Sequence, residues 1–259
     1  VVISEISNYP DAQSRIPKLL LSDAHLGFWE TYSMLEIWQK LETGLSAIPD
    51  SSSTDSPRTL WNRFTGLIDA QSFQFSQSHQ LEAYENCLIA YVSVKDTSNM
   101  NVLIELAQKK NILPAKFHLG WTALPNSQMN PKDGLHDLYG MIALKSSADG
   151  KARLDKPALT YTRSVTDNSS GGIPQIYFGM EGADADAWRR MTAENIHKSV
   201  AIVIDGSVYS WPTVQGEISG GVCSITGNFS EKEINDLVTI LRSQSLPAQM
   251  NLVETNILP

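Results

Sequence analysis

The stretch Ile173–Val253 holds the patterns that most limit what this chain can fold into. Its centre, Val200–Asp205, is almost wholly apolar and is typical of a strand. The pair Asp205–Gly206 follows, and it favours the two positive φ angles that a type I′ turn requires. Ser207–Trp211 then returns as a second strand, and Pro212 ends it. These residues predict a β-hairpin with a two-residue turn.

A helix with a well-marked start is predicted after this hairpin. Ser230 and Glu233 form a capping box, in which each side chain satisfies a backbone N–H that the helix itself leaves unbonded. An apolar stripe at helical spacing predicts that the helix lies on a sheet, and its members are Ile234, Leu237, Val238 and Leu241. The other elements predicted in the stretch are the strands Pro174–Met180, Val222–Thr226 and Met250–Thr255 and the helix Ala183–His197.

The first half of the chain also mixes strands with helices. The predicted strands are Val1–Ile6, His25–Tyr32, Leu88–Val94, Lys116–Ala123 and Leu138–Ser146, and the predicted helices are Met34–Thr43, Leu60–Ile68 and one capped by Asp96 or Thr97. Residues 48–57 and 69–80 are polar and are predicted to be loops or linkers. The order strand, helix, strand, strand occurs from Leu88 and again from Gln175, although no residues match between the two segments. The sequence therefore predicts an α+β fold.

The composition argues against several kinds of partner. With 259 residues and 42% hydrophobic content, the chain can bury one large core or two modest ones. The net charge is −8 and no basic run is present, so we expect no nucleic-acid binding, which needs clustered Lys and Arg. No apolar run approaches the length of a membrane span and no signal peptide is recognised. Because the chain begins inside a strand-like run, we expect it to be part of a larger protein.

The chemically reactive residues form no recognisable catalytic or metal-binding motif. Glu181, Asp184 and Asp186 could bind a divalent cation, but acidic residues at a helix start are explained by capping and the helix dipole. Cys87 and Cys223 have no metal-ligand spacing, and they are either two buried small side chains or one disulfide. The histidines, which show no paired spacing, are His25, His79, His118, His136 and His197. We therefore predict no enzyme activity, no metal and no cofactor, with a spatial Ser-His-Asp set left open.

Four large side chains are candidates for contact with another polypeptide. Trp188 and Met191 lie three residues apart on a predicted helix, where they form either a groove for unfolded segments or part of the core. Tyr209 and Trp211 flank Ser210 and should share one sheet face. That face is either an exposed aromatic strip or core, and the sequence leaves both alternatives open.

The same stretch resembles a known family in ordered detail. The matching residues are Asn195–Ile196, Ala201–Gly206, Val208, Ser210, Pro212, Ile225–Phe229, Leu241–Arg242, Leu246–Ala248 and Val253–Glu254. They are similar to SecD, the membrane component that assists the Sec translocon from the far side of the membrane. The run Phe28–Tyr32 resembles the fused SecD–SecF proteins of the Bacteroidetes group. The sequence departs from the family at His197, Gln244 and Gln249, where glycine, glycine and proline are common.

The resemblance implies a base and a head. We predict a small ferredoxin-like base sheet, incomplete in this chain, from residues 1–32 plus 249–259, with an α+β head, residues 33–248, inserted between them. The two chain crossings would form a double hinge that lets the head rotate as a rigid body. The hinge residues are Tyr32, Ser33, Met34, Leu246, Pro247 and Ala248.

The resemblance also implies a role in protein export. It identifies the chain as the first large periplasmic domain of a SecD or SecDF protein, at the periplasmic face of the bacterial inner membrane. There it would handle emerging preprotein while proton flow through membrane helices outside this chain drives head movement. The implied partners are unfolded preprotein, SecYEG and SecF, and the contact residues would be Trp188, Met191, Tyr209 and Trp211. Two alternatives are a rigid scaffold that docks Sec components and a periplasmic hydrolase that uses His118 or His136.

Overall fold

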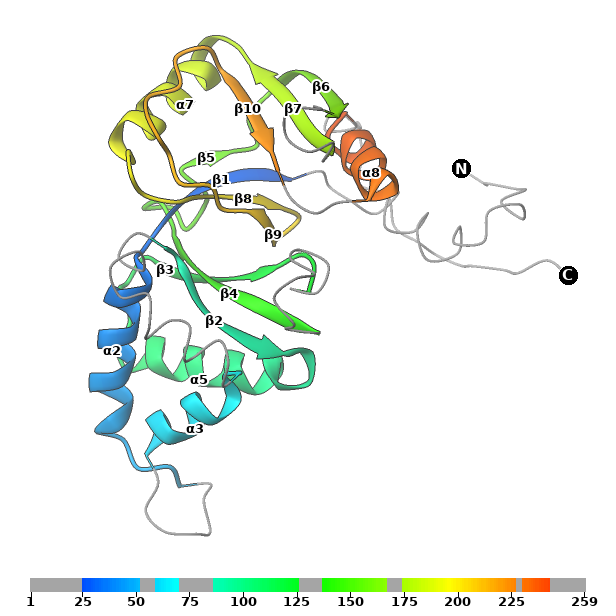
Figure 1. The fold of residues 1–259 in the computed structure, drawn as a ribbon. Helices are drawn as coiled ribbons and strands as arrows, with labels where there is room; N and C mark the ends of the chain where they lie inside the picture. Colours follow the sequence, from blue (N-terminus) through cyan, green and yellow to red (C-terminus); the bar gives the residue numbers. More distant parts are fainter. Residues whose placement is uncertain are drawn as a thin grey trace, which may run out of the picture.

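A computed structural model describes residues 25–51, 59–69, 86–125, 137–166, 174–226 and 230–242 of the chain. In this part of the chain, five α-helices pack against two β-sheets (Figure 1). The helices are α2 (Met34–Ser46), α3 (Leu60–Leu67), α5 (Thr97–Lys109), α7 (Gly182–Glu194) and α8 (Glu231–Arg242). The strands are β1 (Leu26–Thr31), β2 (Leu88–Ser93), β3 (Phe117–Thr122), β4 (Leu138–Lys145), β5 (Leu154–Asp155), β6 (Leu159–Thr166), β7 (Pro174–Met180), β8 (Val200–Ile204), β9 (Ser207–Ser210) and β10 (Val222–Ile225). The predicted α+β class is confirmed.

The larger sheet has seven strands and closes on itself. Its order is β2-β4-β3-β9-β8-β1-β5, and an additional pairing joins β4 to β1. Strands β4, β3, β9, β8 and β1 therefore form a closed ring. The ring interior holds a small apolar cluster that includes Leu144 and Val208. Gly120 fits between them because an added Cβ would lie 2.7 Å from the Val208 side chain and 2.8 Å from that of Leu144.

The molecule divides into two lobes around this ring (Figure 1). We define the upper lobe as β1, β5, β8 and β9 with the second sheet, which has the order β10-β7-β6, and with α7 and α8. Its core lies between the two sheets, and Leu26, Phe28, Ile202 and Phe178 are among its fully buried members. The predicted stripe of α8 faces this core, as expected for a helix that lies on a sheet.

The lower lobe consists of α2, α3 and α5 packed on β2, β4 and β3. The apolar stripe of α2, which is Ile37, Leu41 and Leu45, is fully buried in this second core. The N-cap residues of α2 and α3 are Ser33 and Thr59, whose side chains accept a hydrogen bond from the backbone N–H of the third residue of each helix. In contrast, Asp96 stands at the predicted N-cap position of α5, but its side chain makes no capping hydrogen bond.

The predicted hairpin is confirmed. Asp205 has φ +49° and Gly206 has φ +80°, the two positive angles that the pair was expected to adopt. The Ser230–Glu233 capping box is also present, with the Ser230 amide 2.8 Å from Glu233 Oε2 and the Glu233 amide 3.2 Å from Ser230 Oγ. The strand–helix–strand–strand order does not give two equivalent units, because β7 belongs to the smaller sheet whereas β8 and β9 belong to the larger one.

The conformation at His197 explains why glycine is common at this position in the family that the sequence resembles. His197 has φ +64°, which is a left-handed angle that glycine adopts without steric cost. We expect His197→Gly to raise the free energy of unfolding by about 0.5–1 kcal/mol, since relief of the strain exceeds the added entropy of the unfolded chain. Urea unfolding would measure the change. Ile196→Gly is the control, and it should lower stability because Ile196 is not among the residues with positive φ.

Candidate functional site

The two lobes meet at two short seams, and these are the most distinctive feature of the arrangement. In the first seam β1 pairs antiparallel with β4 through Glu30–Lys145 and Thr31–Leu144. In the second, β3 pairs parallel with β9 through Trp121–Ser207 and Thr122–Val208. Each seam has only two residue pairs, so side chains at the seams contribute strongly to how firmly the lobes are held together.

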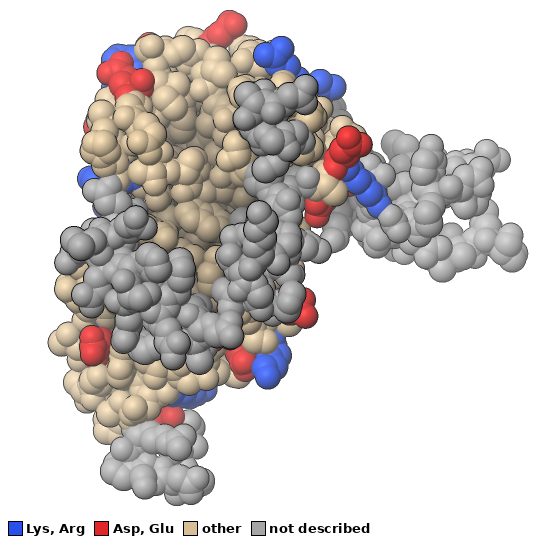
Figure 2. Space-filling model, viewed as in Figure 1, with Lys and Arg blue, Asp and Glu red and all other residues tan. Residues whose placement is uncertain are grey.

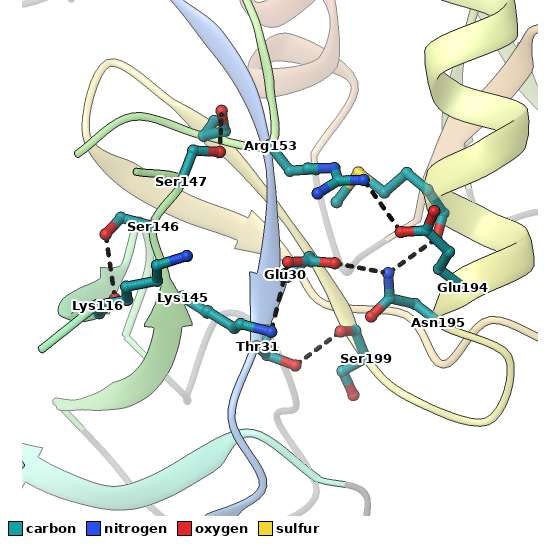
Figure 3. Close-up of polar contacts among 12 residues, drawn as sticks. Glu30, Thr31, Lys116, Lys145, Ser146, Ser147, Arg153, Glu194, Asn195 and Ser199 are labelled. Atoms are coloured by element: carbon teal, nitrogen blue, oxygen red, sulfur yellow. Dashed lines mark hydrogen bonds and ion pairs between the residues drawn. The ribbon is translucent and has the colours of Figure 1, made fainter. Parts of the chain in front are cut away.

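A buried polar network reinforces the first seam (Figure 3). Lys145 Nζ lies 3.6 Å from Glu30 Oε2, and the side-chain amide of Asn195 donates to Glu30 Oε1 at 3.1 Å. The same Asn195 nitrogen also donates to the Met191 carbonyl at 2.8 Å, at the C-terminal end of α7. The Glu30 side chain is only 15% exposed and Asn195 only 4%, so both groups depend on these partners. The network ties β4, β1 and α7 to one carboxylate.

Neighbouring contacts extend the network along β1. The Thr31 hydroxyl donates to the Ser199 carbonyl at 2.7 Å, which fixes β1 to the segment that leads into β8. Arg153 and Glu194 form an ion pair of 3.0 Å beside it, but both side chains are about half exposed, at 45% and 54%. The exposed pair contributes little because solvent screens it. The buried Glu30–Asn195 contact is therefore the stronger part of the site.

Three of the six predicted hinge residues, Tyr32, Ser33 and Met34, lie within the described residues, and each of them makes a hydrogen bond. The Tyr32 amide donates to the Ala143 carbonyl at 2.9 Å and the Met34 amide donates to the Asn86 carbonyl at 2.7 Å. The Ser33 side chain caps α2. The other half, Leu246, Pro247 and Ala248, lies outside the described residues, as do residues 1–24 and 249–259 of the predicted base. The double hinge and the division into base and head stay predictions, and β1 itself pairs with strands of the predicted head.

Trp188 and Met191, two of the predicted contact residues, lie in the upper-lobe core. Their exposed fractions are 3% and 1%, and the Trp188 ring lies 4.6 Å from the ring of Phe28. In this conformation both side chains are part of the core, which is the second of the two alternatives predicted for them, and they do not form an exposed groove. The indole nitrogen of Trp188 has no hydrogen-bond partner among the described residues.

Tyr209 and Trp211, the other two, do not share a sheet face as predicted. Tyr209 packs against the upper-lobe core, whereas Trp211 packs against the cluster inside the ring. The reason is a bulge between β8 and β9, where the pairs Ile202–Ser210 and Val203–Val208 leave Tyr209 as an extra residue. The bulge shifts the alternation by one position. Both side chains are half-buried, and their contact with a preprotein stays a prediction.

The acidic group at the start of α7 has a structural role for one of its members. Asp184 Oδ2 accepts a hydrogen bond from the Ala158 amide at 2.9 Å, which ties the helix to the segment before β6. Glu181 stands at the N-cap position without a side-chain bond, and Asp186 is exposed. Within the described ranges, no three His, Cys, Asp or Glu side chains lie close enough to hold a metal ion.

The histidines within the described ranges are dispersed. His25 Nε2 lies 2.6 Å from Asp155 Oδ1, so a His–Asp pair exists, but no described serine or cysteine hydrogen-bonds to it. His118 stacks on Trp29 with ring centroids 5.2 Å apart, and partial desolvation there lowers its pKa. His197 has the left-handed φ angle described above, and His79 and His136 lie outside the described residues.

Cys87 and Cys223 are free and buried, as the first alternative predicted. Burial raises the pKa of each thiol to about 12 from 9.0. Because the unfolded chain loses these protons first, stability is full below pH 9 and falls as the pH rises toward 12. We expect a loss of about 1 kcal/mol per thiol by pH 10 in urea unfolding. The Cys87→Ala/Cys223→Ala variant should lack this part of the alkaline decline, and an equal decline in the variant would contradict the assignment.

The seam residues were not singled out by sequence reasoning. Asn195 lay within the family resemblance and Glu30 lay in the correct strand, yet they are 165 positions apart and no local pattern joins them. Lys145 carried no signal beyond its position at the end of a predicted strand. The described residues thus define an α+β domain whose candidate site is a structural joint between two lobes.

Comparison with known proteins finds one family model that matches part of this domain and several similar proteins. Residues 143–248 match the family described as SecDF, P1 head subdomain. The protein translocase subunit SecD of Rhodothermus marinus is 31% identical over 170 residues, which cover 66% of this chain and 26% of that protein. The SecD of Rhodobacter capsulatus is 43% identical over 131 residues, covering 51% of this chain and 21% of that protein. A solved structure of SecDF, a membrane component that enhances protein export, covers 100% of this chain and 79% of its own, with 21% identity and a TM-score of 0.47.

The chain contains a segment that matches the SecDF P1 head subdomain, and it is similar to SecD protein translocase subunits. It spans about a quarter of the length of the relatives named above. The matched head segment, residues 143–248, includes every element of the upper lobe except β1 and is narrower than the predicted head. No described helix is long and apolar enough to cross a membrane.

Proposed function

We propose that this chain is the first large periplasmic domain of a SecD or SecDF subunit and that it handles emerging preprotein during export. The family match over residues 143–248 carries this proposal. It rests also on the SecD relatives, which are protein translocase subunits. In this proposal the domain stands at the periplasmic face of the inner membrane and works beside SecYEG and SecF without catalysis of its own.

The two-lobed architecture supports a mechanical role. The upper lobe, which contains most of the matched head segment, is joined to the lower lobe by two short seams and by the cluster inside the ring. The chain also passes between the lobes at Tyr32–Met34 and at residues 146–153. In the proposal the predicted base, with a ferredoxin-like sheet from residues 1–32 and 249–259, connects this body to the membrane portion. A body with its own rigid cores can transmit movement from such a base without unfolding.

Binding of an unfolded polypeptide tests the proposal directly. A fluorescently labelled, unfolded secretory precursor would be titrated with the 259-residue chain, and its anisotropy should rise with a weak affinity. Weak binding is expected because an export component must release the segment that it holds. A flat titration at high protein concentration would remove direct preprotein handling. Export that survived replacement of residues 33–248 by an unrelated domain in the parent protein would favour the docking-scaffold alternative.

A further inference from the structure

The smaller sheet of the upper lobe has two edges, and the hydrogen-bond pattern shows which backbone groups each edge presents. The Met180 amide donates to the Gly221 carbonyl at 2.8 Å, so this pair is a hydrogen-bonded pair of the antiparallel ladder between β7 and β10. Such pairs alternate with non-bonded pairs along the ladder. The N–H and C=O groups of Val222 and Ser224 therefore point away from β7, toward the outer edge of β10.

The opposite edge of the sheet, on β6, is covered by α8. Arg242 at the end of α8 donates from Nε and from a terminal nitrogen to the Thr162 carbonyl, at 2.9 Å and 2.7 Å. By the same alternation this carbonyl points away from β7. A charged side chain that occupies an edge carbonyl is one of the ways in which proteins prevent a strand from adding there.

The β10 edge has no such protection among the described residues. No described residue bonds to the backbone groups of Val222 or to the Ser224 amide, and the Ser224 carbonyl receives only the Cys223 thiol at 3.8 Å. The strand contains neither a charged residue nor proline, which are the usual means of blocking an edge. The side chain of Val222 is 41% exposed.

The outer face beside this edge is apolar and aromatic. In one row across the sheet, Val222 pairs with Gly179 and Gly179 pairs with Tyr161. The Tyr161 ring lies over Gly179, where an added Cβ would be 2.3 Å from it. Arg163, which lies 5.7 Å from that ring, is the charged residue of this face. Figure 2 shows few charged side chains over the middle of the upper lobe and more of them at its rim.

We propose that the β10 edge binds one extended, uncharged segment of an unfolded polypeptide as an added β-strand. The backbone groups of Val222 and Ser224 would supply main-chain hydrogen bonds, and alternate side chains of the segment would lie beside Val222 and Ser224 on the outer face. This inference rests on the proposed function and gives it a site. A four-residue edge offers few bonds, which suits a segment that is held and then released.

A proline substitution tests this edge with a matched control. Ser224→Pro removes the outward amide but no bond between β10 and β7, whereas Ser224→Ala keeps the amide and removes only the hydroxyl. The probe is a fluorescein-labelled peptide of ten alternating valine and threonine residues with a lysine at each end. We expect at least a fivefold weaker affinity for the proline variant and no more than a twofold change for the alanine variant.

Each outcome of this titration decides between the two proposals. Equal binding by wild type and the proline variant would overturn the edge site while leaving preprotein handling intact. A lack of binding by wild type to both this peptide and the unfolded precursor would overturn both. If the proline variant fails to fold, Val222→Lys replaces it, because a lysine on an edge strand blocks strand addition and leaves the ladder intact.

A second readout identifies the occupant of the edge. Amide exchange of wild type followed by NMR should show the Val222 and Ser224 amides exchanging quickly in the free chain and slowly with the peptide. Slow exchange without peptide that quickens on dilution would assign the edge to a second copy of the chain. Slow exchange without peptide at every concentration would assign it to another segment of the same chain. Either result would overturn the proposal.

Discussion

Replacing Phe28 with alanine is expected to lower the free energy of unfolding by about 3–5 kcal/mol, because the change removes a fully buried ring from the centre of the upper lobe. The Phe28 ring centroid lies 4.6 Å from that of Trp188 on α7 and 5.8 Å from that of Phe178 on β7. The Phe28 side chain, which extends from β1 of the larger sheet, thus contacts both α7 and the smaller sheet. Urea unfolding followed by circular dichroism would measure the loss.

The neighbouring residue Trp29 provides the control for this prediction. It lies on the opposite face of β1, half-buried, where it stacks on His118 beside the ring interior. Although tryptophan is the larger side chain, Trp29→Ala should cost less than Phe28→Ala, because part of its surface already contacts water. A smaller loss for Phe28→Ala than for Trp29→Ala would show that the upper-lobe core does not depend on the Phe28 ring.

Much of the fold can be predicted from local sequence, because in several segments the different local signals favour the same secondary structure. Pro174–Met180 is a strand with the bounds that its sequence predicts, and α8 has both its predicted capping box and its predicted buried stripe. In these segments the apolar spacing, the turn residues and the cap residues agree. The hairpin at Asp205–Gly206 is a further case, because few residue pairs adopt two positive φ angles cheaply.

The elements that the sequence missed are those whose burial pattern is weak. Strand β6 was not predicted because only Thr162 of its eight residues is buried, so no apolar alternation marks it. Its strand character comes from pairing with β7 and from Arg242, which are contacts distant in the sequence. The predicted common face of Tyr209 and Trp211 failed for a related reason, since a bulge depends on the partner strand as well as on the local residues.

The candidate site was harder to predict than the fold. A buried asparagine carries no periodic signal, and its role depends on which carboxylate the tertiary structure places beside it. Asn195 meets Glu30 only because α7 ends over β1, and Lys145 joins them only because β1 closes the ring with β4. Sequence reasoning therefore favoured the large aromatic side chains, which it recognises easily, over the small polar group that holds the carboxylate of the first seam.

Replacing Asn195 with alanine is expected to lower the free energy of unfolding by about 1–3 kcal/mol, since it removes the hydrogen bond to a nearly buried carboxylate. Asn195→Asp should cost more at neutral pH, because it places a second carboxylate where the amide now lies 3.1 Å from Glu30 Oε1. Two charged carboxylates at this distance repel each other in the folded state, and protonation of either one removes the repulsion. Relative to wild type, this variant should therefore be most stable at low pH and should lose stability as the pH rises to neutrality.

The reciprocal exchange separates the Glu30 contact from the other bond that Asn195 makes. Adding Glu30→Gln to Asn195→Asp restores one amide and one carboxylate at the seam, so stability at pH 7 should recover in part and its dependence on pH should weaken. Recovery should be incomplete, because an aspartate cannot donate to the Met191 carbonyl and because Lys145 loses its nearest carboxylate. Glu194→Gln, at an exposed ion pair, should change stability by less than about 1 kcal/mol. If Asn195→Asp matched wild type at pH 7, the Asn195–Glu30 contact would contribute nothing to stability, and the lobes would be held together by the strand pairs and by the cluster inside the ring.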